Sequence, residues 1–263
     1  MGGDSSHAPP PLRILLINPN TTSSITGLLN DVYATLSLES SLTPSYFTCP
    51  SPGIPSINSP DDANESADLC LPHLIPELPH HDLFLICCYS HHPLVHQLKE
   101  ECTKLSAEAT HGGSGARKYV TGIFEASVLQ SLQLLHPKQS FGVVSTGKIW
   151  ETAVTEAVHG FLGAKDVQRY VGCETTGLNA DQLHDLPKEQ VFEKMKDATK
   201  KLFEKGSEVG AICLGCAGMV GLDEAVREAC LEELGEEKGK QVHIVDGVKA
   251  GIVQLFGAGR GAF

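Results

Sequence analysis

Two cysteines that follow two similar apolar segments are the residues of this sequence best suited to chemistry. Cys88 follows the segment Asp-Leu-Phe-Leu-Ile-Cys at 82–87, and Cys216 follows the segment Val-Gly-Ala-Ile-Cys-Leu-Gly at 209–215. Each segment predicts a buried parallel strand that leads into a helical pattern. A thiolate and a thiol that face each other can remove a proton from one face of a carbon atom and deliver another to the opposite face. The pair therefore suggests a substrate held between two groups that each transfer one proton.

The two cysteines need surroundings that support this chemistry. A free cysteine titrates near pH 8.5, and we expect backbone N–H groups at the start of the following helices to stabilise the thiolate. Backbone amides around Tyr89, Ser90, Ala217 and Gly218 are candidates for binding the oxygen of a developing enolate. We expect the two sulfur atoms to lie several ångströms apart across a cleft. The alternative is that both cysteines are inert core thiols, since cysteine is among the most buried residue types.

Neighbouring cysteines compete for the same roles. Successive side chains of a strand point to opposite faces, so only one of Cys87 and Cys88 can face a crevice above the sheet. Cys213 stands in the same relation to Cys216 and is expected in the core.

Other polar residues follow predicted strands. Asn18 could bind a substrate amide or carbonyl, or it could simply be a turn asparagine. Ser145 and Thr146 could bind a ring imide or a carboxylate, or they could cap the helix that starts near residue 149. Glu125 could orient a ligand, although a structural role in the first turn of its helix is favoured.

Five histidines surround the first cysteine, and they raise the alternative of a zinc site. His92 and His96 have the i, i+4 spacing of a helical metal pair. The sequence has no Cys-x-x-Cys partner for them, and His80 and His81 lie at the opposite end of the strand from Cys88. We therefore expect surface histidines, with His91 or His92 at the mouth of a pocket, and no metal.

Composition narrows the class of protein. The chain has 263 residues, of which 41% are hydrophobic and 20% charged, as in ordinary globular proteins. Its net charge of −12 disfavours nucleic acid and anionic membrane surfaces as partners. Nine cysteines in a chain without a secretory signal favour reduced thiols in the cytoplasm. No apolar stretch reaches the roughly 18 residues of a membrane span. A small-molecule substrate and a homo-oligomer are expected.

The order of apolar segments predicts how the residues are positioned. Strands alternate with helical patterns throughout, which indicates βαβ units and parallel sheets. We expect a flexible tail at 1–11, a loop at 49–60 and a connector at 111–116. Strands are expected at 13–18, 82–88, 119–123, 141–145, 167–171, 211–214 and 242–245, and helices at 21–38, 61–79, 93–109, 125–135, 149–162, 188–205, 222–234 and 248–256. The first α/β half would comprise residues 12–118 and 248–263, and the second half residues 119–247.

Several short motifs resemble the aspartate/glutamate/hydantoin racemase superfamily, most closely its hydantoin and allantoin racemase branch in fungi. The motifs are Ile-Asn-Pro-Asn-Thr-Thr at 17–22, Ile-Cys-Cys-Tyr-Ser at 86–90, Thr-Gly-Ile-Phe-Glu-Ala at 121–126, Gly-Val-Val-Ser-Thr at 142–146, Leu-Gly-Cys-Ala-Gly-Met at 214–219 and Val-Asp-Gly-Val at 245–248. The resemblance implies two Rossmann-like halves related by a pseudo-two-fold axis, with the active site between them. It selects Cys88 and Cys216 as the catalytic pair, and it implies no metal, nucleotide or pyridoxal cofactor.

The resemblance also implies a substrate class. We expect an isomerase of nitrogen metabolism that racemises a hydantoin-like ring, either allantoin or a 5-substituted hydantoin. An amino-acid racemase, a cis–trans isomerase and a decarboxylase of the same fold are alternatives, as is a non-catalytic ligand-binding protein. The sequence departs from this branch in two places. His91 stands where the branch usually has an acidic residue, which affects the expected substrate preference. The stretch 101–117 is longer than usual, so a lid or an oligomer contact is expected to differ.

Overall fold

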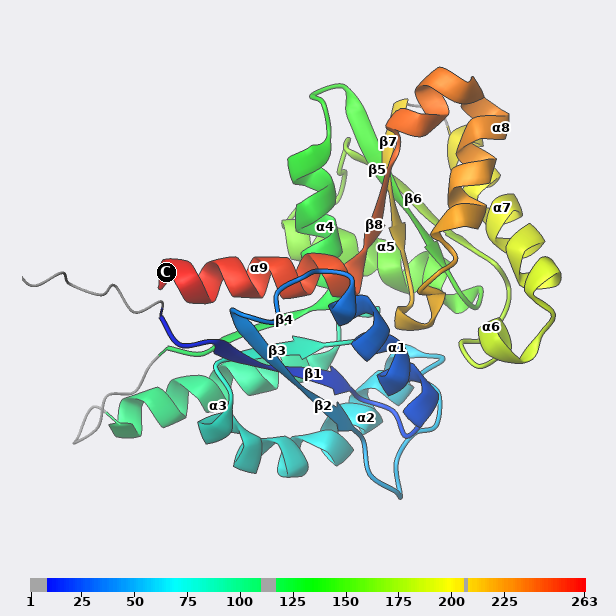
Figure 1. Cartoon of the computed structure of the whole chain (residues 1–263). Coiled ribbons are helices and arrows are strands. Elements are labelled where there is room, and N and C mark those ends of the chain that lie inside the picture. Colours follow the sequence, from blue (N-terminus) through cyan, green and yellow to red (C-terminus); the bar gives the residue numbers. More distant parts are fainter. Residues whose placement is uncertain (1–8, 110–116, 206–207) are drawn as a thin grey trace, which may run out of the picture.

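The chain folds into two four-stranded parallel sheets with helices on both faces (Figure 1), as the sequence predicted. The computed structural model describes residues 9–109, 117–205 and 208–263. Of the predicted tail, residues 1–8 lie outside the described residues, and the predicted connector at 111–116 lies outside them entirely.

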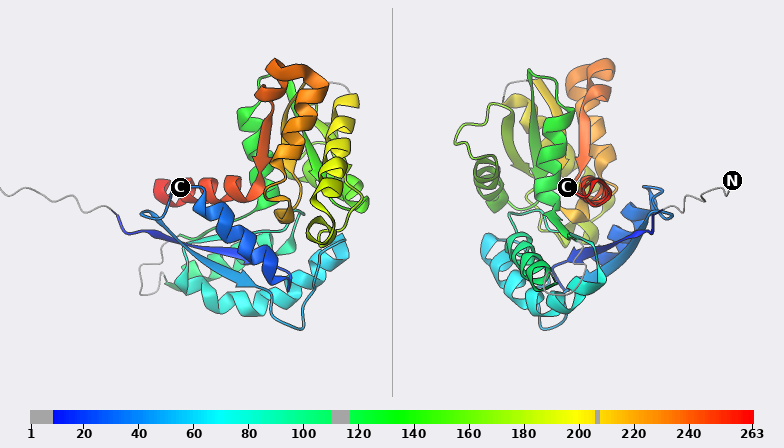
Figure 2. Two further views of the ribbon diagram at one scale, coloured as in Figure 1. Left: turned by 45° about the vertical axis from the view of Figure 1, so that its right-hand side comes forward. Right: turned by 90° about the vertical axis from the view of Figure 1, so that its left-hand side faces the viewer.

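The first sheet has the strand order β2-β1-β3-β4. Helices α1 and α9 cover one face, and α2 and α3 cover the other, as the views in Figure 2 show. The elements are β1 (Leu12–Asn18), α1 (Ser23–Ala34), β2 (Leu42–Thr48), α2 (Pro60–Leu74), the 3-10 helix η1 (Ile75–His80), β3 (Leu83–Ile86), α3 (Pro93–Ala109), β4 (Tyr119–Gly122) and the C-terminal α9 (Gly247–Gly261).

The second sheet has the strand order β6-β5-β7-β8, which repeats the order of the first. Helices α4 and α5 pack on one face, and α7 and α8 on the other. The elements are α4 (Ile123–Leu134), β5 (Gln139–Ser145), α5 (Ile149–Leu162), β6 (Tyr170–Thr175), α6 (Gln182–Asp185), α7 (Lys188–Glu204), β7 (Glu208–Leu214), the 3-10 helix η2 (Ala217–Met219), α8 (Asp223–Gln241) and β8 (His243–Asp246). The repeated order makes β3 and β7 equivalent.

The boundary between the halves differs from the prediction. Strand β4 was assigned to the second half from residue 119 onward, but it pairs in parallel with β3 at the edge of the first sheet. Helix α4 then crosses to the second sheet, and α9 returns to pack against β3 and β4. The sequence showed where β4 lies but not its partner, because pairing depends on distant residues.

Strand β2 was not predicted. It carries Pro44, which pairs with Ile14 of β1, and proline disfavours a strand in most settings because it lacks the N–H of the ladder. At the edge of a sheet the missing donor can face away from the neighbouring strand. The loop that was predicted at 49–60 therefore follows directly on the end of a strand.

One core joins the two halves. Leu16 of β1, Phe124 of α4 and Val143 of β5 belong to the same buried cluster. Leu15 and Ile17 point the other way, into a separate cluster beneath α2 and α3. This alternation follows from the two-residue period of a strand.

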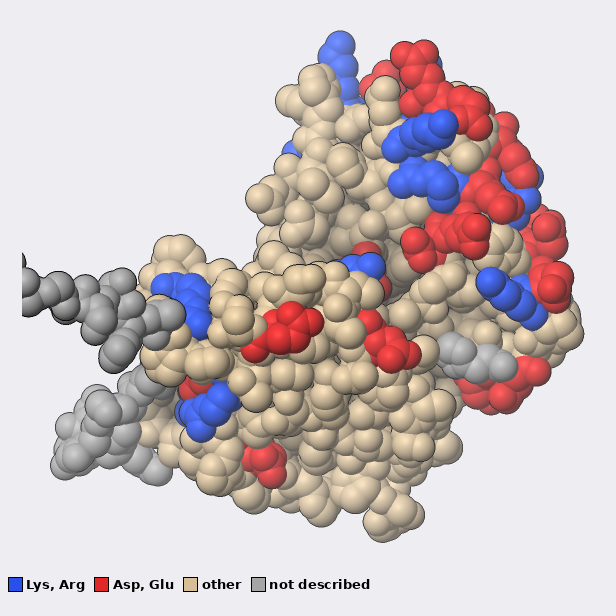
Figure 3. All heavy atoms as spheres, viewed as in Figure 1, with Lys and Arg blue, Asp and Glu red and all other residues tan. Residues whose placement is uncertain are grey.

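Charged side chains are unevenly distributed over the surface. They gather over α7 and α8 of the second half, as Figure 3 shows. There Lys196 bridges Glu228 and Glu232, and Lys200 also contacts Glu232. Exposed ion pairs of this kind contribute little to stability, so this face is chiefly a solvated surface. In the part of the chain that the structure describes, no helix combines the length and apolar character that crossing a membrane requires.

Candidate active site

Cys88 and Cys216 occupy equivalent places in the two halves. Cys88 lies just beyond β3, and Cys216 lies just beyond β7. Both are half-buried, whereas the other cysteines are buried. Both line one small cavity at the carboxyl ends of the strands. The structure therefore brings the two predicted thiols to one site between the halves.

The cavity is small and uncharged. Its volume is about 40 Å³, which is room for a few water molecules at roughly 10–15 Å³ each. None of the described residues that line it has a charged side chain. The lining residues are Asn20, Ile25, Ile57, Cys87, Cys88, Tyr89, Thr146, Trp150, Ala180, Gly215, Cys216, Ala217 and Gly218. Ligand pockets usually measure about 300–1,000 Å³, so a ring substrate requires the cavity to widen.

The backbone after β7 holds Cys216 at the cavity. Cys216 caps η2, and its Sγ accepts a hydrogen bond from the Gly218 N–H at 3.3 Å. A Cβ on Gly215 would lie 2.6 Å from the Val144 carbonyl oxygen, so only glycine allows this close approach to β5. The Ser145 hydroxyl donates to the Gly215 carbonyl at 3.0 Å and fixes the same segment.

The pKa values of both thiols are raised. Burial raises the pKa of Cys216 to about 11, against the lowering effect of the Gly218 N–H. Burial also raises the pKa of Cys88 to about 12; the Ser90 hydroxyl opposes this rise, while the charges of a Cys216 thiolate and of Glu125 add to it. Both groups are therefore thiols near neutral pH.

The expected stabilisation by helix N-termini is thus only partly present. Cys216 has one backbone donor, in a short 3-10 helix, and α8 begins further along the chain. The Sγ of Cys88 contacts the Ser90 Oγ at 3.5 Å, and α3 begins only at Pro93. The sequence showed that helices follow both cysteines, but the length of the intervening turns depends on the fold.

Four of the predicted substrate-binding residues line the cavity, namely Tyr89, Thr146, Ala217 and Gly218. The Tyr89 hydroxyl contacts the Ser127 hydroxyl at 2.8 Å, which fixes its ring at the wall. Ser90 and Ser145 are buried beside the site but are not among its lining residues. Neither Ser145 nor Thr146 caps α5, whose N-cap position is Lys148.

Asn18 and Asn20 divide the role that was predicted for Asn18. The Asn18 Nδ2 donates to the Thr22 carbonyl at 2.9 Å and to the Thr26 hydroxyl at 3.1 Å. Its Oδ1 accepts the N–H of Asn20 at 3.2 Å. Asn18 therefore holds the turn. Asn20 lines the cavity, and its Oδ1 also accepts the N–H of Thr22 at 2.9 Å in the same turn.

The other cavity residues that the sequence did not single out come from loops and helix starts. Ile57 lies in the loop after β2, and Ala180 lies in the loop after β6. Trp150 stands in the first turn of α5, and Ile25 in the first turn of α1. In a parallel sheet, loops at the carboxyl ends of the strands gather at one edge, and this rule would have pointed to them once β2 was known.

The two cysteines next to the predicted pair lie in different places, and so do the two histidines with helical spacing. Cys213 is a core residue that contacts Ser131, as predicted, whereas Cys87 belongs to the core and also borders the cavity. His92 was predicted at the surface or at the mouth of a pocket, but it is buried and does not line the cavity, and burial lowers its pKa to about 3. His96 is exposed and pairs with Glu100, so the helical histidine pair does not converge. Among the described residues, no three side chains of the metal-ligating types form a cluster.

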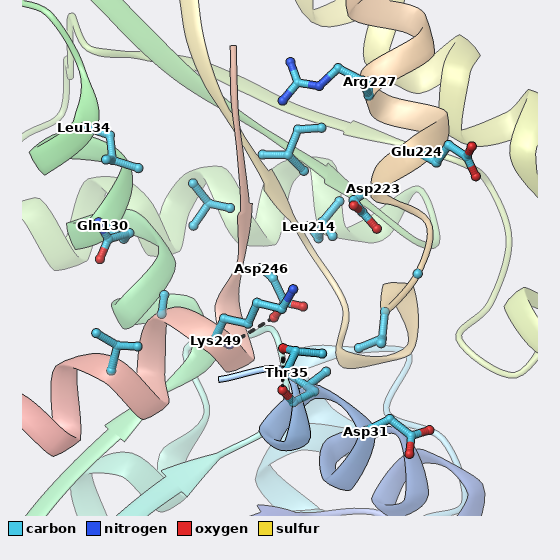
Figure 4. Close-up of a pocket in the computed structure, with 17 residues that line it drawn as sticks. Asp31, Thr35, Gln130, Leu134, Leu214, Asp223, Glu224, Arg227, Asp246 and Lys249 are labelled. Atoms are coloured by element: carbon cyan, nitrogen blue, oxygen red, sulfur yellow. Dashed lines mark hydrogen bonds between the residues drawn. The ribbon is translucent and has the colours of Figure 1, made fainter. Parts of the chain in front are cut away.

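A second, larger hollow of about 960 Å³ lies between α1, α4, α8 and α9 (Figure 4). The residues that line it and are labelled in Figure 4 include Leu134 and Gln130 of α4, Arg227 of α8, Asp31 of α1 and Lys249 of α9. None of the predicted site residues and no cysteine is among its described lining residues. The thiol chemistry therefore belongs to the small cavity.

Comparison with known proteins points to one family. A family model described as Asp/Glu/hydantoin racemase matches residues 14–255. An uncharacterized protein of Schizosaccharomyces pombe is 32% identical over 249 residues, which cover 93% of this chain and 90% of the yeast protein.

Two solved structures of bacterial racemases share the fold. The allantoin racemase of Pseudomonas fluorescens superposes with a TM-score of 0.71 at 23% identity and covers 95% of this chain and 91% of its own. The allantoin racemase of Klebsiella pneumoniae superposes with a TM-score of 0.67 at 24% identity, covering 94% and 87% of the two chains.

Proposed function

Because the chain belongs to the Asp/Glu/hydantoin racemase family, we propose that it is a racemase or epimerase that uses Cys88 and Cys216 as two opposed bases. The observation that carries this proposal is the pairing of two half-buried thiols at one cavity, one from each half of a repeated fold.

The proposed step transfers one proton to the substrate carbon and one from it. A thiolate at one cysteine removes the proton from the near face of a carbon next to a carbonyl, and the resulting enolate takes a proton from the thiol on the far face. The thiol and the thiolate have then exchanged roles, and the opposite enantiomer reacts in the reverse sense. No external acid or base is consumed.

The enolate oxygen needs donors at the cavity wall. Asn20 and Thr146, which carry an amide and a hydroxyl, both belong to the lining, and the backbone N–H groups of η2 lie beside Cys216. Hydrogen-bond donors that are fixed before reaction stabilise developing charge most effectively in a site from which water is excluded.

The uncharged lining favours a neutral ring over a free amino acid. An amino acid carries a carboxylate and an ammonium group, and burying either without a partner is costly. A dicarboxylate, as a cis–trans isomerase or a decarboxylase would bind, meets the same obstacle. A hydantoin ring presents amide groups and no formal charge, so we propose allantoin or a 5-substituted hydantoin as the substrate.

Deuterium wash-in tests the proposal against a non-catalytic ligand-binding protein. Single enantiomers of allantoin and of 5-substituted hydantoins are incubated with the full chain in deuterium oxide, and incorporation at C5 is followed above the rate without protein. Incorporation together with loss of optical activity supports a racemase. Incorporation no faster than in the blank, for every ring tested, would reject the proposal.

A further inference from the structure

Strand β8 forms one edge of the second sheet, and its outer side lies open between two helices. Among the described strands it pairs only with β7. Two hollows of about 960 Å³ and about 860 Å³ follow one another along this edge. Both are lined by Leu134 of α4, Arg227 of α8 and Ile244 of β8. An uncovered edge strand presents backbone N–H and C=O groups with which the strand of another chain can pair.

The edge strands β2 and β6 carry features that oppose such pairing, and β8 lacks them. β2 contains Pro44, which has no N–H to donate. β6 has one extra residue, Val171, against β5, and Gly172 follows it with a φ of 123°. A bulge of this kind turns an edge away from a partner. β8 has the sequence His-Ile-Val-Asp at 243–246, without proline, glycine or lysine, and the carboxylate of Asp246 is occupied in capping α9.

Exposed apolar side chains lie beside this edge. On α4, Leu129 is 47% exposed and Leu134 is 38% exposed, and on α9, which packs against α4, Val253 is 49% exposed. Leu134 and Val253 both line the larger hollow. These three residues are half of the six large apolar side chains that are exposed among the described residues. Their concentration on two adjoining helices is typical of a protein contact surface.

The charges along the edge change sign. The hollow at the start of β8 is lined by two cations and one carboxylate, Arg227, Lys240 and Glu208. The hollow at its end is lined by two cations and four carboxylates, namely Arg227, Lys249, Asp31, Asp223, Glu224 and Asp246. Figure 4 shows Arg227 toward the start of the strand and Asp31 beyond its end. The start of the edge is therefore net positive and its end net negative.

We propose that this edge binds a second copy of the chain, with the two β8 strands antiparallel about a two-fold axis. The positive start of each β8 then lies opposite the negative end of the other, so the surface is complementary to itself. A parallel arrangement places like charges opposite each other, and an acidic or a basic partner protein matches only one end. The two second sheets join into one continuous sheet, and the apolar side chains of α4 and α9 become buried. The proposal does not depend on the proposed racemase activity.

The apolar part of the surface is tested by sedimentation velocity of the full chain at about 1–100 µM. The parent chain should sediment with twice the mass of a single chain at the upper end of this range. Leu134→Glu should weaken association at least about a hundredfold, because it buries an unpaired carboxylate twice in a symmetric contact. Val253→Glu should have the same effect, and it decides alone if Leu134→Glu loses its cooperative unfolding transition. Ile75→Glu is the matched control, since Ile75 is 43% exposed but lies in η1 of the first half.

The antiparallel arrangement is tested by reversing charges at the two ends. Lys240→Glu and Glu224→Lys each place like charges opposite each other and should weaken association about tenfold. The double variant exchanges the signs of both ends and should return association to within about threefold of the parent. Lys104→Glu is the matched control, because Lys104 is 64% exposed and Lys240 67% exposed, and each pairs with a glutamate of its own helix.

Each outcome decides the proposal. Weakening in the four single variants, recovery in the double variant and unchanged association in both controls support it. Hydrogen exchange at the amides of β8 should also slow as the concentration rises, because strand pairing protects its outward N–H groups. A parent chain that stays monomeric at about 100 µM overturns the proposal. An assembly that Leu134→Glu and Val253→Glu leave intact, or a double variant that associates no better than the single reversals, overturns it as well.

Discussion

Cys88 and Cys216 occupy the same place in two halves with the same strand order, yet their surroundings differ. Cys216 is held by a backbone N–H from its own 3-10 turn. Cys88 has the hydroxyl of Ser90 as its partner. The repeated sheet thus determines where the two sulfur atoms lie, while the loops after the strands determine the polar partner of each one.

This difference suits a reaction that needs two groups in opposite protonation states. Two thiols with identical surroundings would share the proton equally, and neither would be set as donor. The chain obtains unequal neighbours because the loops that follow β3 and β7 differ in sequence, and each loop supplies the partner of its own cysteine. The following predictions address this comparison, starting with the largest effect.

Cys88→Ser and Cys216→Ser should each reduce racemisation by at least about a thousandfold, because serine is a far weaker acid than cysteine and general acid–base catalysis contributes about 10²–10⁴-fold. Each variant should still exchange the C5 proton of one enantiomer with deuterium, since the remaining thiolate can take and return a proton on its own face. The two variants should prefer opposite enantiomers. Polarimetry and proton NMR in deuterium oxide measure the two effects.

Cys213→Ser is the control for these variants. Its sulfur is buried and already contacts the Ser131 hydroxyl at 3.1 Å, so a serine can keep that contact. We expect activity close to that of the parent chain. A properly folded Cys216→Ser that racemises at the parent rate would show that the two-base mechanism is wrong.

The pH dependence should be steep and should rise toward alkaline pH. The pKa values of about 11 and about 12 lie above neutral pH, so the thiolate fraction in the free enzyme increases about tenfold per pH unit between pH 7 and 9. The ratio kcat/KM, which reports on the free enzyme, should follow this increase. A flat profile over the same range would contradict raised thiol pKa values in the free enzyme.

Alkylation should modify Cys88 and Cys216 before Cys70, Cys102 and Cys230. The preference follows from access, because the first two are half-buried and the other three are buried. It does not follow from acidity, since burial raises the pKa of Cys102 to about 11 as well. A difference of at least about tenfold in rate is expected, measured by mass spectrometry during inactivation. Complete inactivation with both site thiols unmodified would count against the assignment.

The sequence predicted that Cys88 and Cys216 meet at one cavity and that the sheets are parallel, because both features leave strong local signals. Continuous apolar segments that end at a cysteine are visible without knowledge of the fold, and alternating strands and helices define the class. The partner of β4 and the existence of β2 left no such signal. The first depends on which distant strand is adjacent, and the second is a short edge strand that contains Pro44.

The direction of individual side chains was the least predictable feature. The motif at 17–22 indicated an asparagine at the site, but Asn18 is fully buried and hydrogen-bonded within the turn, whereas Asn20 lines the cavity. Glu125 was expected to have a structural role, and its contact with His91 arises only from the path of α4. In both cases the residue type was informative, while its role depended on packing between residues far apart in the sequence.

Substitution of the two asparagines separates holding the turn from contacting the substrate, and its effects are the smallest. Asn18→Ala removes three hydrogen bonds in a buried turn, and we expect the free energy of unfolding to fall by about 1–3 kcal/mol because partners are left unpaired. KM should stay within about threefold. Asn20→Ala removes one hydrogen bond of the same turn and also an amide from the cavity wall, and we expect KM to rise about tenfold, as the loss of about 1–1.5 kcal/mol from one hydrogen bond to the substrate implies. Urea unfolding and initial rates on both enantiomers measure the two effects. If Asn18→Ala raised KM more than Asn20→Ala did, the substrate contact would belong to Asn18, and the turn would have to open when the cavity widens.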